Sequence, residues 1–477
     1  MKSKSTAYQS MDECFEYSGE WWLPDQPAAR FFGTLKYKPE TNVFLELSGG
    51  YDEFEAFRES WKHEAVFGVS ESGEEITLRE CHIGRFSTSR SSVGSTASAA
   101  LEPRWVFIGG HFLSDEELRF DSVEIWYPYL TGWLTHPLRR PDRSINTDAD
   151  TRNRNSEFPI IALDEIATMS IEYVPNFQKR PGSGMPDYAP SEAAYVHFKF
   201  AGGTSLEEIW RRYKRHWEHF FSLALGRPAR ALDIRGVLSD GGQKRIAIIE
   251  GIDHRADFYE MFPFVEMLFP FSEIKDHVDT YLKNWYSKMD CFEPVFNMYF
   301  AVLYQPDLYL DHQFLTYVIA LETYHRIVTK NAPKFCKEEY NRLVEGMLAS
   351  IPQEHEKYQK HFRSRLQFGN EPTLREKLRY LVDKMPKVSE TFICHNDSGC
   401  KEFVHVVTET RNGLVHSAEW CSTKGIHTIG ELAIIVKKLQ LLMQICLLQE
   451  IGLSDRQICE FVGQTPVGRL LRGKSNH

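Results

Sequence analysis

Three residues near the carboxyl end of the chain have side chains that can cleave a phosphodiester bond: Arg411, Asn412 and His416. They lie in the segment 401–420, whose apolar residues recur every three to four positions, which predicts a helix. Asn412 and His416 are four residues apart and share one side of such a helix, while Arg411 falls among its apolar positions. A guanidinium at an apolar position needs a carboxylate, a phosphate or a water-filled cleft, because burying it alone is costly. The segment therefore predicts a ridge with a fixed cation, an amide and a titratable imidazole.

This combination of side chains suits cleavage of an RNA phosphodiester without a metal ion. A neutral imidazole takes a proton from the 2′-hydroxyl or gives one to the leaving 5′-oxygen. The guanidinium holds the phosphoryl oxygens as negative charge builds, and the amide orients the attacking hydroxyl. The products would be a 2′,3′-cyclic phosphate and a 5′-hydroxyl. The simpler interpretation is a structural helix that carries these residues by chance.

The spacing of the two reactive residues also predicts how many copies of the chain form a site. Arg411 and His416 are five residues apart, so on an ideal helix they diverge by about 140°. One copy would make a poor site, and two copies facing each other across a symmetric interface would complete it. Gly413 lies between them and weakens the helix, which lets His416 turn towards the cleft.

Several parts of the chain carry a family resemblance. The pattern Arg-Asn-x-x-x-His on a late helix of an all-α domain resembles the motif of the HEPN ribonuclease family. The segments 19–24 (GEWWLP) and 32–35 (FGTL), together with Leu321-Glu322, resemble the ApeA family of bacterial anti-phage proteins. In that family a β-rich region precedes a HEPN domain.

The resemblance to HEPN ribonucleases implies roles for four residues. Arg411 and His416 would be the catalytic pair, Asn412 an orienting residue and Glu322 a supporting one. Glu322 lies on an apolar face of the predicted helix 311–330, where its carboxylate is expected to hold the Arg411 guanidinium in a bidentate pair. The alternative for Glu322 is a solvated position at the edge of that face.

The resemblance to ApeA also implies a biological role, which is defence against phage by abortive infection. RNA cleavage, with tRNA among the targets, would stop translation and halt phage growth. The β-rich N-terminal region would hold the nuclease inactive or sense a phage component as its trigger. HEPN domains typically dimerise, so a homodimer or a higher homo-oligomer is expected.

Composition limits the other classes to which the chain can belong. The 477 residues are enough for two or three domains, and the net charge of −10 argues against a general nucleic-acid coat, although positive charge can be local. The nine cysteines are scattered and odd in number, which predicts reduced thiols rather than a disulfide framework. The polar residues 1–10 and the lack of a long apolar run predict neither secretion nor a membrane span, so we expect a cytoplasmic protein.

The order of the hydrophobic patterns predicts an α+β fold. Residues 1–135 are β-rich, with short aromatic and β-branched runs that indicate a sandwich-like domain. Within them, 87–100 is poor in large apolar residues and predicts a loop or a disordered insertion. Residues 136–292 continue as a mixed α/β region with a hairpin signal at 239–242. Residues 293–477 are helical throughout and predict an all-α, HEPN-like bundle.

Two clusters of cations outside the motif are candidate RNA contacts. A helix is predicted from the capping pair Thr204 and Glu207 to about Leu225, and cations alternate with aromatic residues along it. The candidates on this helix are Arg211, Arg212, Lys214 and Arg215. Two more, in a tail without acidic residues, are Arg469 and Arg472. The alternatives are a helix that packs its aromatic residues inward and solvates its charges, and a frayed terminus.

Three other interpretations stay open at this point. The spacing of Cys394, Cys400 and His405 is a weak zinc signal, because it is not a paired C-x-x-C, and we assign neither a metal nor another cofactor. The helical bundle can also bind RNA or a nucleotide without cutting it, as a scaffold or sensor. The tryptophans of the first 135 residues are compatible with a carbohydrate-binding sandwich fused to an adaptor bundle.

Overall fold

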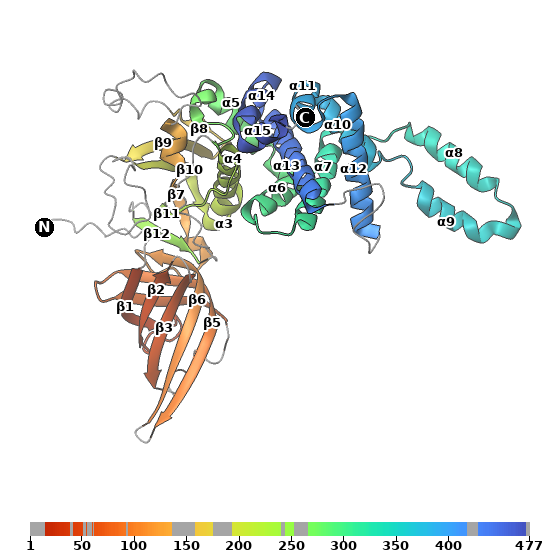
Figure 1. Cartoon of the computed structure of the whole chain (residues 1–477). Helices are drawn as coiled ribbons and strands as arrows, with labels where there is room; N and C mark the ends of the chain where they lie inside the picture. The colour runs from red at the N-terminus through yellow and green to blue at the C-terminus, as the bar shows by residue number, and fades with distance from the viewer. Residues whose placement is uncertain are drawn as a thin grey trace, which may run out of the picture. The chain divides into compact units, whose positions relative to one another are not determined.

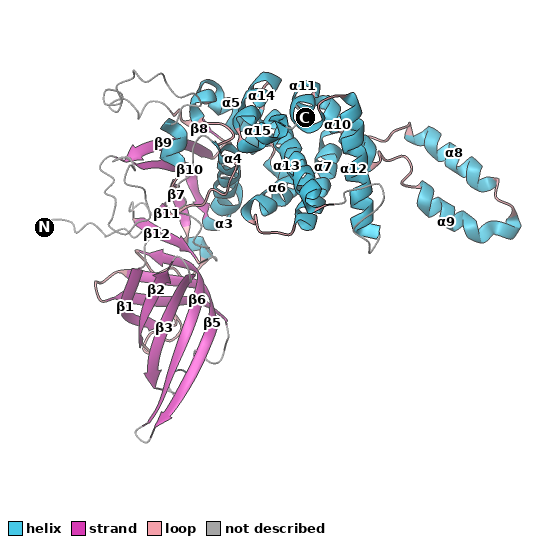
Figure 2. Cartoon of the chain, in the orientation of Figure 1, coloured by secondary structure: helices cyan, strands magenta, loops and turns pink. Residues whose placement is uncertain are grey.

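A computed structural model describes most of the chain. The described residues are 15–38, 42–50, 54, 60, 62–91, 94–135, 158–174, 193–239, 244–251, 266–416 and 428–473. Contacts divide the chain into two compact units. The first comprises residues 1–218, 229–264 and 270–279, and the second comprises 219–228, 265–269 and 280–477. Strands dominate the first unit and helices the second (Figure 1, Figure 2), which confirms the predicted α+β fold class.

The strands of the first unit form one antiparallel sheet. They are β1 (Phe15–Trp22), β2 (Phe31–Lys38), β3 (Asn42–Gly50), β4 (Lys62–Ser70), β5 (Glu75–Ser91), β6 (Gly94–Ile108), β7 (Arg119–Trp126), β8 (Ile161–Ala162), β9 (Ala167–Val174), β10 (Ala193–Ser205), β11 (Asp233–Leu238) and β12 (Arg245–Glu250). The order across the sheet is β3-β2-β1-β4-β5-β6-β12-β11-β7-β10-β9-β8. Short helices in this unit are η2 (Asp115–Glu117), α2 (Leu130–Thr135), η7 (Phe271–Glu273) and η8 (Lys275–His277).

The first six strands close into a barrel, because β3 also pairs with β6. Residues 96–101 of β6 pair with β3, and residues 105–108 pair with β12, so β6 belongs both to the barrel and to the rest of the sheet. The sequence predicted a sandwich-like domain, and the strands instead form a single sheet that curls onto itself. The physical reason is the length of β6. One edge of β6 pairs with β5, and the other edge is long enough to pair with both β3 and β12.

Residues 87–91 and 94–100 are strand rather than the predicted loop. The small side chains of Ala97 and Ala99 fill the inside of the barrel, where both are buried. Opposite them on the outer face, the hydroxyls of Ser87 and Ser98 are hydrogen-bonded across the two strands at 2.7 Å. The low hydrophobicity of residues 87–100 therefore comes from small side chains inside the barrel and polar side chains on its outer face. It does not indicate a loop.

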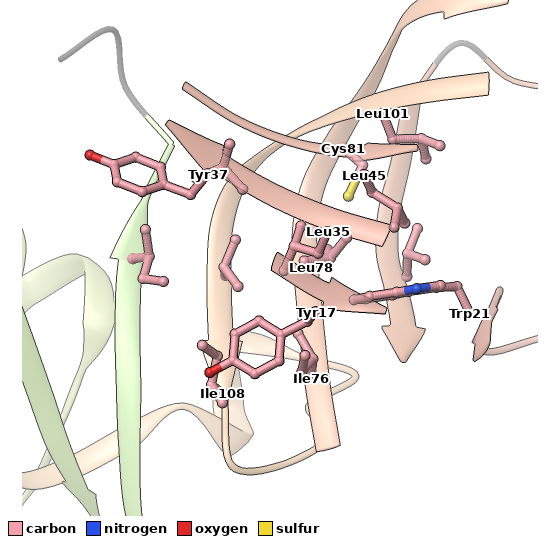
Figure 3. Packing of buried hydrophobic residues seen from close by; sticks show 14 of the residues in the cluster. Tyr17, Trp21, Leu35, Tyr37, Leu45, Ile76, Leu78, Cys81, Leu101 and Ile108 are labelled. Atoms are coloured by element: carbon pink, nitrogen blue, oxygen red, sulfur yellow. The ribbon is translucent and has the colours of Figure 1, made fainter. Parts of the chain in front are cut away.

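The barrel is filled by aromatic and aliphatic side chains from all six strands. Figure 3 shows Trp21 inside the barrel among Leu35, Leu45 and Leu78. Trp21 is fully buried, and its indole nitrogen donates a hydrogen bond to the carbonyl of Gly33 at 3.1 Å. A Cβ atom at Gly68 would lie 2.2 Å from the Trp21 ring, so this position of β4 has no room for a side chain. Around Trp21, the described side chains of the barrel are therefore closely packed.

One long helix follows β10, in three segments: α3 (Leu206–Glu208), η4 (Ile209–Lys214) and α4 (Arg215–Leu225). The N-cap is Ser205, whose hydroxyl accepts a hydrogen bond from the Glu208 amide at 3.3 Å, and not the predicted Thr204. Thr204 still pairs with β7 as part of β10, so the helix begins one residue later. The segment η4 is π-helical, and its wider turn shifts the phase of the side chains that follow.

The second unit is a bundle of helices. They are α5 (Val278–Ser287), α6 (Met289–Tyr304), α7 (Leu310–Val328), α8 (Lys337–Ala349), η9 (Gln353–His355), α9 (Glu356–Leu366), α10 (Leu374–Lys384), α11 (Pro386–Ser389), η10 (Glu390–Cys394), α12 (Asp397–His416), α13 (Ile429–Ile451), α14 (Asp455–Gln464) and α15 (Pro466–Gly473). The apolar helix α13 packs against α7 and α10 and lies at the centre of the bundle. It begins at a capping box of Thr428 and Glu431 and ends at Gly452. No helix among the described residues is both long enough and apolar enough for a membrane span.

Candidate active site

The helix α12 carries the Arg-Asn-x-x-x-His motif on its exposed half. Its first half is anchored by Cys400, Phe403, Val404 and Val407, which are buried in the bundle. From residue 408 to residue 415, no described side chain is fully buried. The periodicity that predicted an inward face is therefore confirmed for the first half of α12, and the motif follows where that face reaches the surface.

Arg411 and Asn412 lie side by side at this end of α12. Arg411 is half-buried, Asn412 is exposed, and Nη1 of Arg411 donates a hydrogen bond to Oδ1 of Asn412 at 3.3 Å. No carboxylate of the described residues forms an ion pair with Arg411. Among the described residues, the guanidinium can therefore accept an anionic ligand without first breaking an ion pair. His416 is the last residue of the helix, and its side chain lies outside the part of the structure that is described.

The predicted ion pair between Glu322 and Arg411 is not formed among the described residues. Glu322, on α7, instead accepts a hydrogen bond from Nζ of Lys377 on α10 at 3.1 Å. Both side chains are largely buried, with 22% and 17% of their surfaces exposed. The helix α10 packs against both α7 and α12 and brings a lysine to the Glu322 carboxylate. Glu322 therefore fastens α10 to α7.

The same helix α10 contributes charged groups to α12. Nη2 of Arg375 lies 3.1 Å from Nδ1 of His405 and 3.7 Å from the Glu409 carboxylate. His405 and Glu409 are one turn apart, and Asn412 continues the same stripe. The sequence analysis did not identify Arg375 or Glu409. Glu409 could have been found, because it lies four residues after His405 and three before Asn412, which places all three on one side of a helix. Arg375, His405 and Glu409 therefore form a polar cluster on the side of α12 that carries Asn412.

The three residues of the weak zinc signal do not converge on one point. Cys394 and Cys400 form a disulfide that joins η10 to the first turn of α12, whereas the sequence predicted reduced thiols. The ring of His405 is instead engaged by Arg375. In the ranges that the structure describes, no three metal-binding side chains cluster. The prediction of reduced thiols was wrong for Cys394 and Cys400, because neither the number nor the spacing of cysteines shows which thiols lie close together in the fold.

His325 follows Glu322 by one turn on α7 and is an imidazole of the bundle interior. It is buried and packs edge-on against Tyr380, with ring centroids 5.0 Å apart. Burial and the nearby Lys377 charge lower the pKa of His325 below its usual value, although the Glu322 carboxylate acts in the opposite direction. The surroundings of His325 therefore favour its neutral form, and its ring packs against Tyr380.

The cations predicted as RNA contacts on the long helix of the first unit do not form one exposed surface. Lys214 is buried, with Nζ 2.9 Å from the Glu218 carboxylate and 3.6 Å from that of Glu250. Arg212 lies 3.3 Å from the Asp164 carboxylate, and of these four cations only Arg211 is exposed. Arg215 is half-buried. Lys214 therefore neutralises carboxylates of the interior, and the buried rings of Tyr213 and Trp217 match the alternative of a helix that packs its aromatic residues inward.

The cations predicted near the carboxyl end belong to the short helix α15 rather than to a frayed tail. The guanidinium of Arg472 stacks on the Phe392 ring at 5.0 Å from its centroid. Arg469 donates a hydrogen bond to the backbone carbonyl of Gln464 and is exposed. Arg472 therefore ties α15 to η10, and Arg469 keeps a solvent-facing charge.

Two family models match the chain. The model described as ApeA N-terminal domain 1 matches residues 16–285, which is more than half of the chain. The model described as Apea-like HEPN matches residues 315–457, which include Glu322, α10 and the whole of α12. No curated protein and no solved structure shows a significant match.

Proposed function

Since the chain belongs to the ApeA family and ends in an ApeA-like HEPN domain, we propose that it is a metal-independent endoribonuclease. The two domains support a nuclease role in anti-phage defence in general. The proposal adds the substrate, RNA, and the products, a 2′,3′-cyclic phosphate and a 5′-hydroxyl. The observation that carries it is Arg411, a half-buried guanidinium without a carboxylate partner among the described residues, beside Asn412 on a helix of the HEPN domain.

In the proposed mechanism, Arg411 binds the non-bridging oxygens of the scissile phosphate. Its charge stabilises the transition state as negative charge accumulates on phosphorus-bound oxygens. His416 removes the proton of the 2′-hydroxyl or protonates the leaving 5′-oxygen, and Asn412 orients the attacking hydroxyl. Because Arg411 and His416 are five residues apart on one helix, we infer that two copies of the chain supply the complete site. A homodimer then contains two such sites.

The biological proposal is abortive infection in the cytoplasm. RNA cleavage, with tRNA as one target class, stops translation in an infected cell and thereby limits phage growth. The barrel-containing first unit would restrain the nuclease or recognise a phage component as its trigger. If a chain lacking residues 1–270 still becomes toxic only on infection, this sensing role is wrong.

The test of the enzymatic proposal is cleavage of total bacterial RNA by the purified full-length protein in EDTA. Fragments with 2′,3′-cyclic phosphate and 5′-hydroxyl ends are the expected result. Cleavage that requires added Mg²⁺ or Mn²⁺ would contradict the metal-independent mechanism. If the protein binds RNA but does not cut it, even with extract of infected cells, the non-catalytic scaffold is the better account.

Glu322 enters the proposal as a positioning residue that acts through Lys377. We expect Glu322→Gln to lower RNA cleavage by about tenfold at most, because it loosens α10 without removing a group that touches RNA. Lys377→Met should give the same loss, and the double variant should lose no more than either single one, since both changes break one contact. Additive losses in single-turnover cleavage would show that Glu322 has a partner other than Lys377.

A further inference from the structure

The helices α8 and α9 form a hairpin that projects from the other helices of the second unit (Figure 1). Val344 and Leu348 of α8 are its buried side chains. The amide of Gln359 on α9 donates a hydrogen bond to the carbonyl of Leu348 at 3.2 Å, and the hydroxyl of Tyr340 donates one to the carbonyl of Leu366 at 2.7 Å. The hairpin is thus held together mainly by contacts between its own two helices.

The root of the hairpin is fixed by Asn370. Its side-chain oxygen accepts a hydrogen bond from the Phe335 amide at 2.9 Å, and its side-chain nitrogen donates one to the Phe335 carbonyl at 3.0 Å. The backbone of Lys334 donates to the Asn370 carbonyl at 2.9 Å. The two chain segments that enter and leave the hairpin are therefore hydrogen-bonded to each other. This fixes the base of the hairpin, so α9 belongs to an ordered helical pair.

The surface of α9 is basic. Its eleven residues contain four cations (Lys357, Lys360, Arg363 and Arg365) and one acid (Glu356), a net charge of +3 in a chain of net charge −10. Arg363 forms an ion pair with Glu345 of α8, which neutralises it. Lys357, Lys360 and Arg365 are exposed, and none has an ion pair among the described residues. Three positive charges are thus available on the outside of this helix.

Aromatic rings lie between these cations. Tyr358 and Phe362 are four residues apart on α9 and are 45% and 47% exposed. Nζ of Lys357 lies 5.1 Å from the centre of the Tyr358 ring. Both rings are therefore presented to solvent beside the cations, where a ligand can reach them. Cations that bind phosphates, interleaved with rings that stack on bases, are the features of a surface for single-stranded nucleic acid.

We propose that α9 is an RNA-binding arm of this protein, which contacts unpaired segments of the substrate through Lys357, Lys360 and Arg365 and stacks bases on Tyr358 and Phe362. The inference rests on the proposed ribonuclease function and names the surface that holds its substrate. A second copy of the chain is a poorer occupant, because a symmetric contact between two α9 helices would oppose like charges. RNA is the better occupant, because its negative phosphates are attracted to the positive charge of α9.

The arm is also connected to the candidate active site. The chain runs from Asn370 directly into α10, whose first turn carries Arg375. Arg375 in turn contacts His405 and Glu409 on α12, ahead of Asn412. RNA bound along α9 is therefore held on the helix that precedes α10 in the chain, and α10 borders the motif helix. Such an arm raises affinity for RNA without taking part in the chemical step.

The test compares RNA binding by the full-length protein and by the triple variant Lys357→Glu, Lys360→Glu, Arg365→Glu. The probe is a short fluorescent 2′-O-methyl RNA, which lacks the 2′-hydroxyl that the proposed cleavage needs. We expect Kd to rise at least about tenfold, and the slope of log K against log salt to become shallower by about 2, because three phosphate contacts are lost. Cleavage of ordinary RNA should show a raised KM with kcat at saturation unchanged.

A matched control reverses three exposed cations elsewhere on the second unit, Lys387→Glu, Lys437→Glu and Arg456→Glu. If RNA affinity falls equally in both triple variants, the loss reflects the net charge of the protein, and the arm is not a binding surface. If wild-type protein neither binds nor cuts RNA, the proposed function itself fails, which is a distinct outcome. Tyr358→Ala with Phe362→Ala should weaken binding without changing the salt slope. A change from dimer to monomer in that variant, with RNA affinity retained, would overturn the proposal in favour of self-association.

Discussion

Replacing Arg411 with alanine is expected to reduce RNA cleavage by about a hundred- to a thousandfold, the usual loss when one transition-state donor is removed. Arg411→Lys should recover part of the rate, because it keeps the charge but not the two-pronged hydrogen bonding of a guanidinium. His416→Ala should cost about a hundred- to ten-thousandfold, as expected for loss of a general acid or base. The measurement is single-turnover cleavage of one defined RNA, beside the thermal melt of each variant.

The control for this series is Val415→Ala, since Val415 lies on the same exposed end of α12 and is 51% exposed. It should retain full activity and the same melting temperature. Equal losses in Val415→Ala and Arg411→Ala would show that the helix end is merely sensitive to change. Retention of the wild-type rate by Arg411→Ala would remove Arg411 from the mechanism.

Mixing the two inactive variants tests whether a site is shared between copies. In a heterodimer of Arg411→Ala and His416→Ala chains, one of two shared sites still has both groups, so random mixing should restore about a quarter of the activity. If both groups of each site came from one chain, mixing would restore nothing. The experiment requires subunit exchange, which is followed by labelling each variant with a different dye.

The second large effect is expected at Lys214, which the sequence assigned to RNA and the structure places in the interior. Burial alone lowers the pKa of Lys214, but the carboxylates of Glu218 and Glu250 more than compensate and raise it, so the lysine stays charged. Lys214→Met would leave two buried carboxylates without their cation. We expect it to lower the free energy of unfolding by about 3–5 kcal/mol, as measured by urea unfolding of the full chain.

The pH dependence of this loss has a definite sign. Burial already raises the pKa of Glu218 above its usual value, and the charge of Lys214 opposes that rise. Without Lys214, the pKa of Glu218 in the folded state rises further above that in the unfolded state. The contribution of Glu218 to stability is then retained at low pH and lost as the pH rises through the folded-state value. The deficit of Lys214→Met against wild type should therefore shrink as the pH falls towards about 5. The double variant with Glu250→Gln should recover part of the stability at neutral pH.

Arg211→Met is the matched control, because Arg211 lies on the same helix and is exposed. It should leave stability within about 0.5 kcal/mol of wild type. If Lys214→Met were as stable as Arg211→Met and bound RNA less tightly, Lys214 would be a surface contact and the buried ion pair would be unimportant.

Sequence periodicity was sufficient for elements whose residues are close in the chain. It predicted the helix that carries Arg411 and Asn412 and the all-α region that begins near residue 293. It also predicted that strands precede helices. The motif could be recognised for the same reason, since its residues lie within two turns of one helix.

Features that depend on distant residues were not predictable in this way. The closure of the barrel depends on pairing Leu45 with Leu101, for which no local pattern exists. The partner of Glu322 depends on which helix packs beside α7, and Lys377 had no special sequence context. At Thr204 and Ser205 the error was local, because two adjacent hydroxyl residues compete for the same cap. The buried position of Lys214 depends in part on Glu250, which lies on the later strand β12 and which no local pattern connects to this helix.

The strand β6, shared by the barrel and the remaining sheet, has a consequence for the timing of folding. Its pairing with β3 joins residues far apart in the chain, and such contacts form in milliseconds to seconds, whereas helical bundles fold in microseconds to milliseconds. During translation at about 5–20 residues per second, synthesis of residues 280–477 takes on the order of ten to forty seconds. The slow barrel therefore has time to close before the fast-folding nuclease unit is complete. The barrel, to which we assign a restraining or sensing role only as a proposal, is thus in place before the last helices of the HEPN domain leave the ribosome.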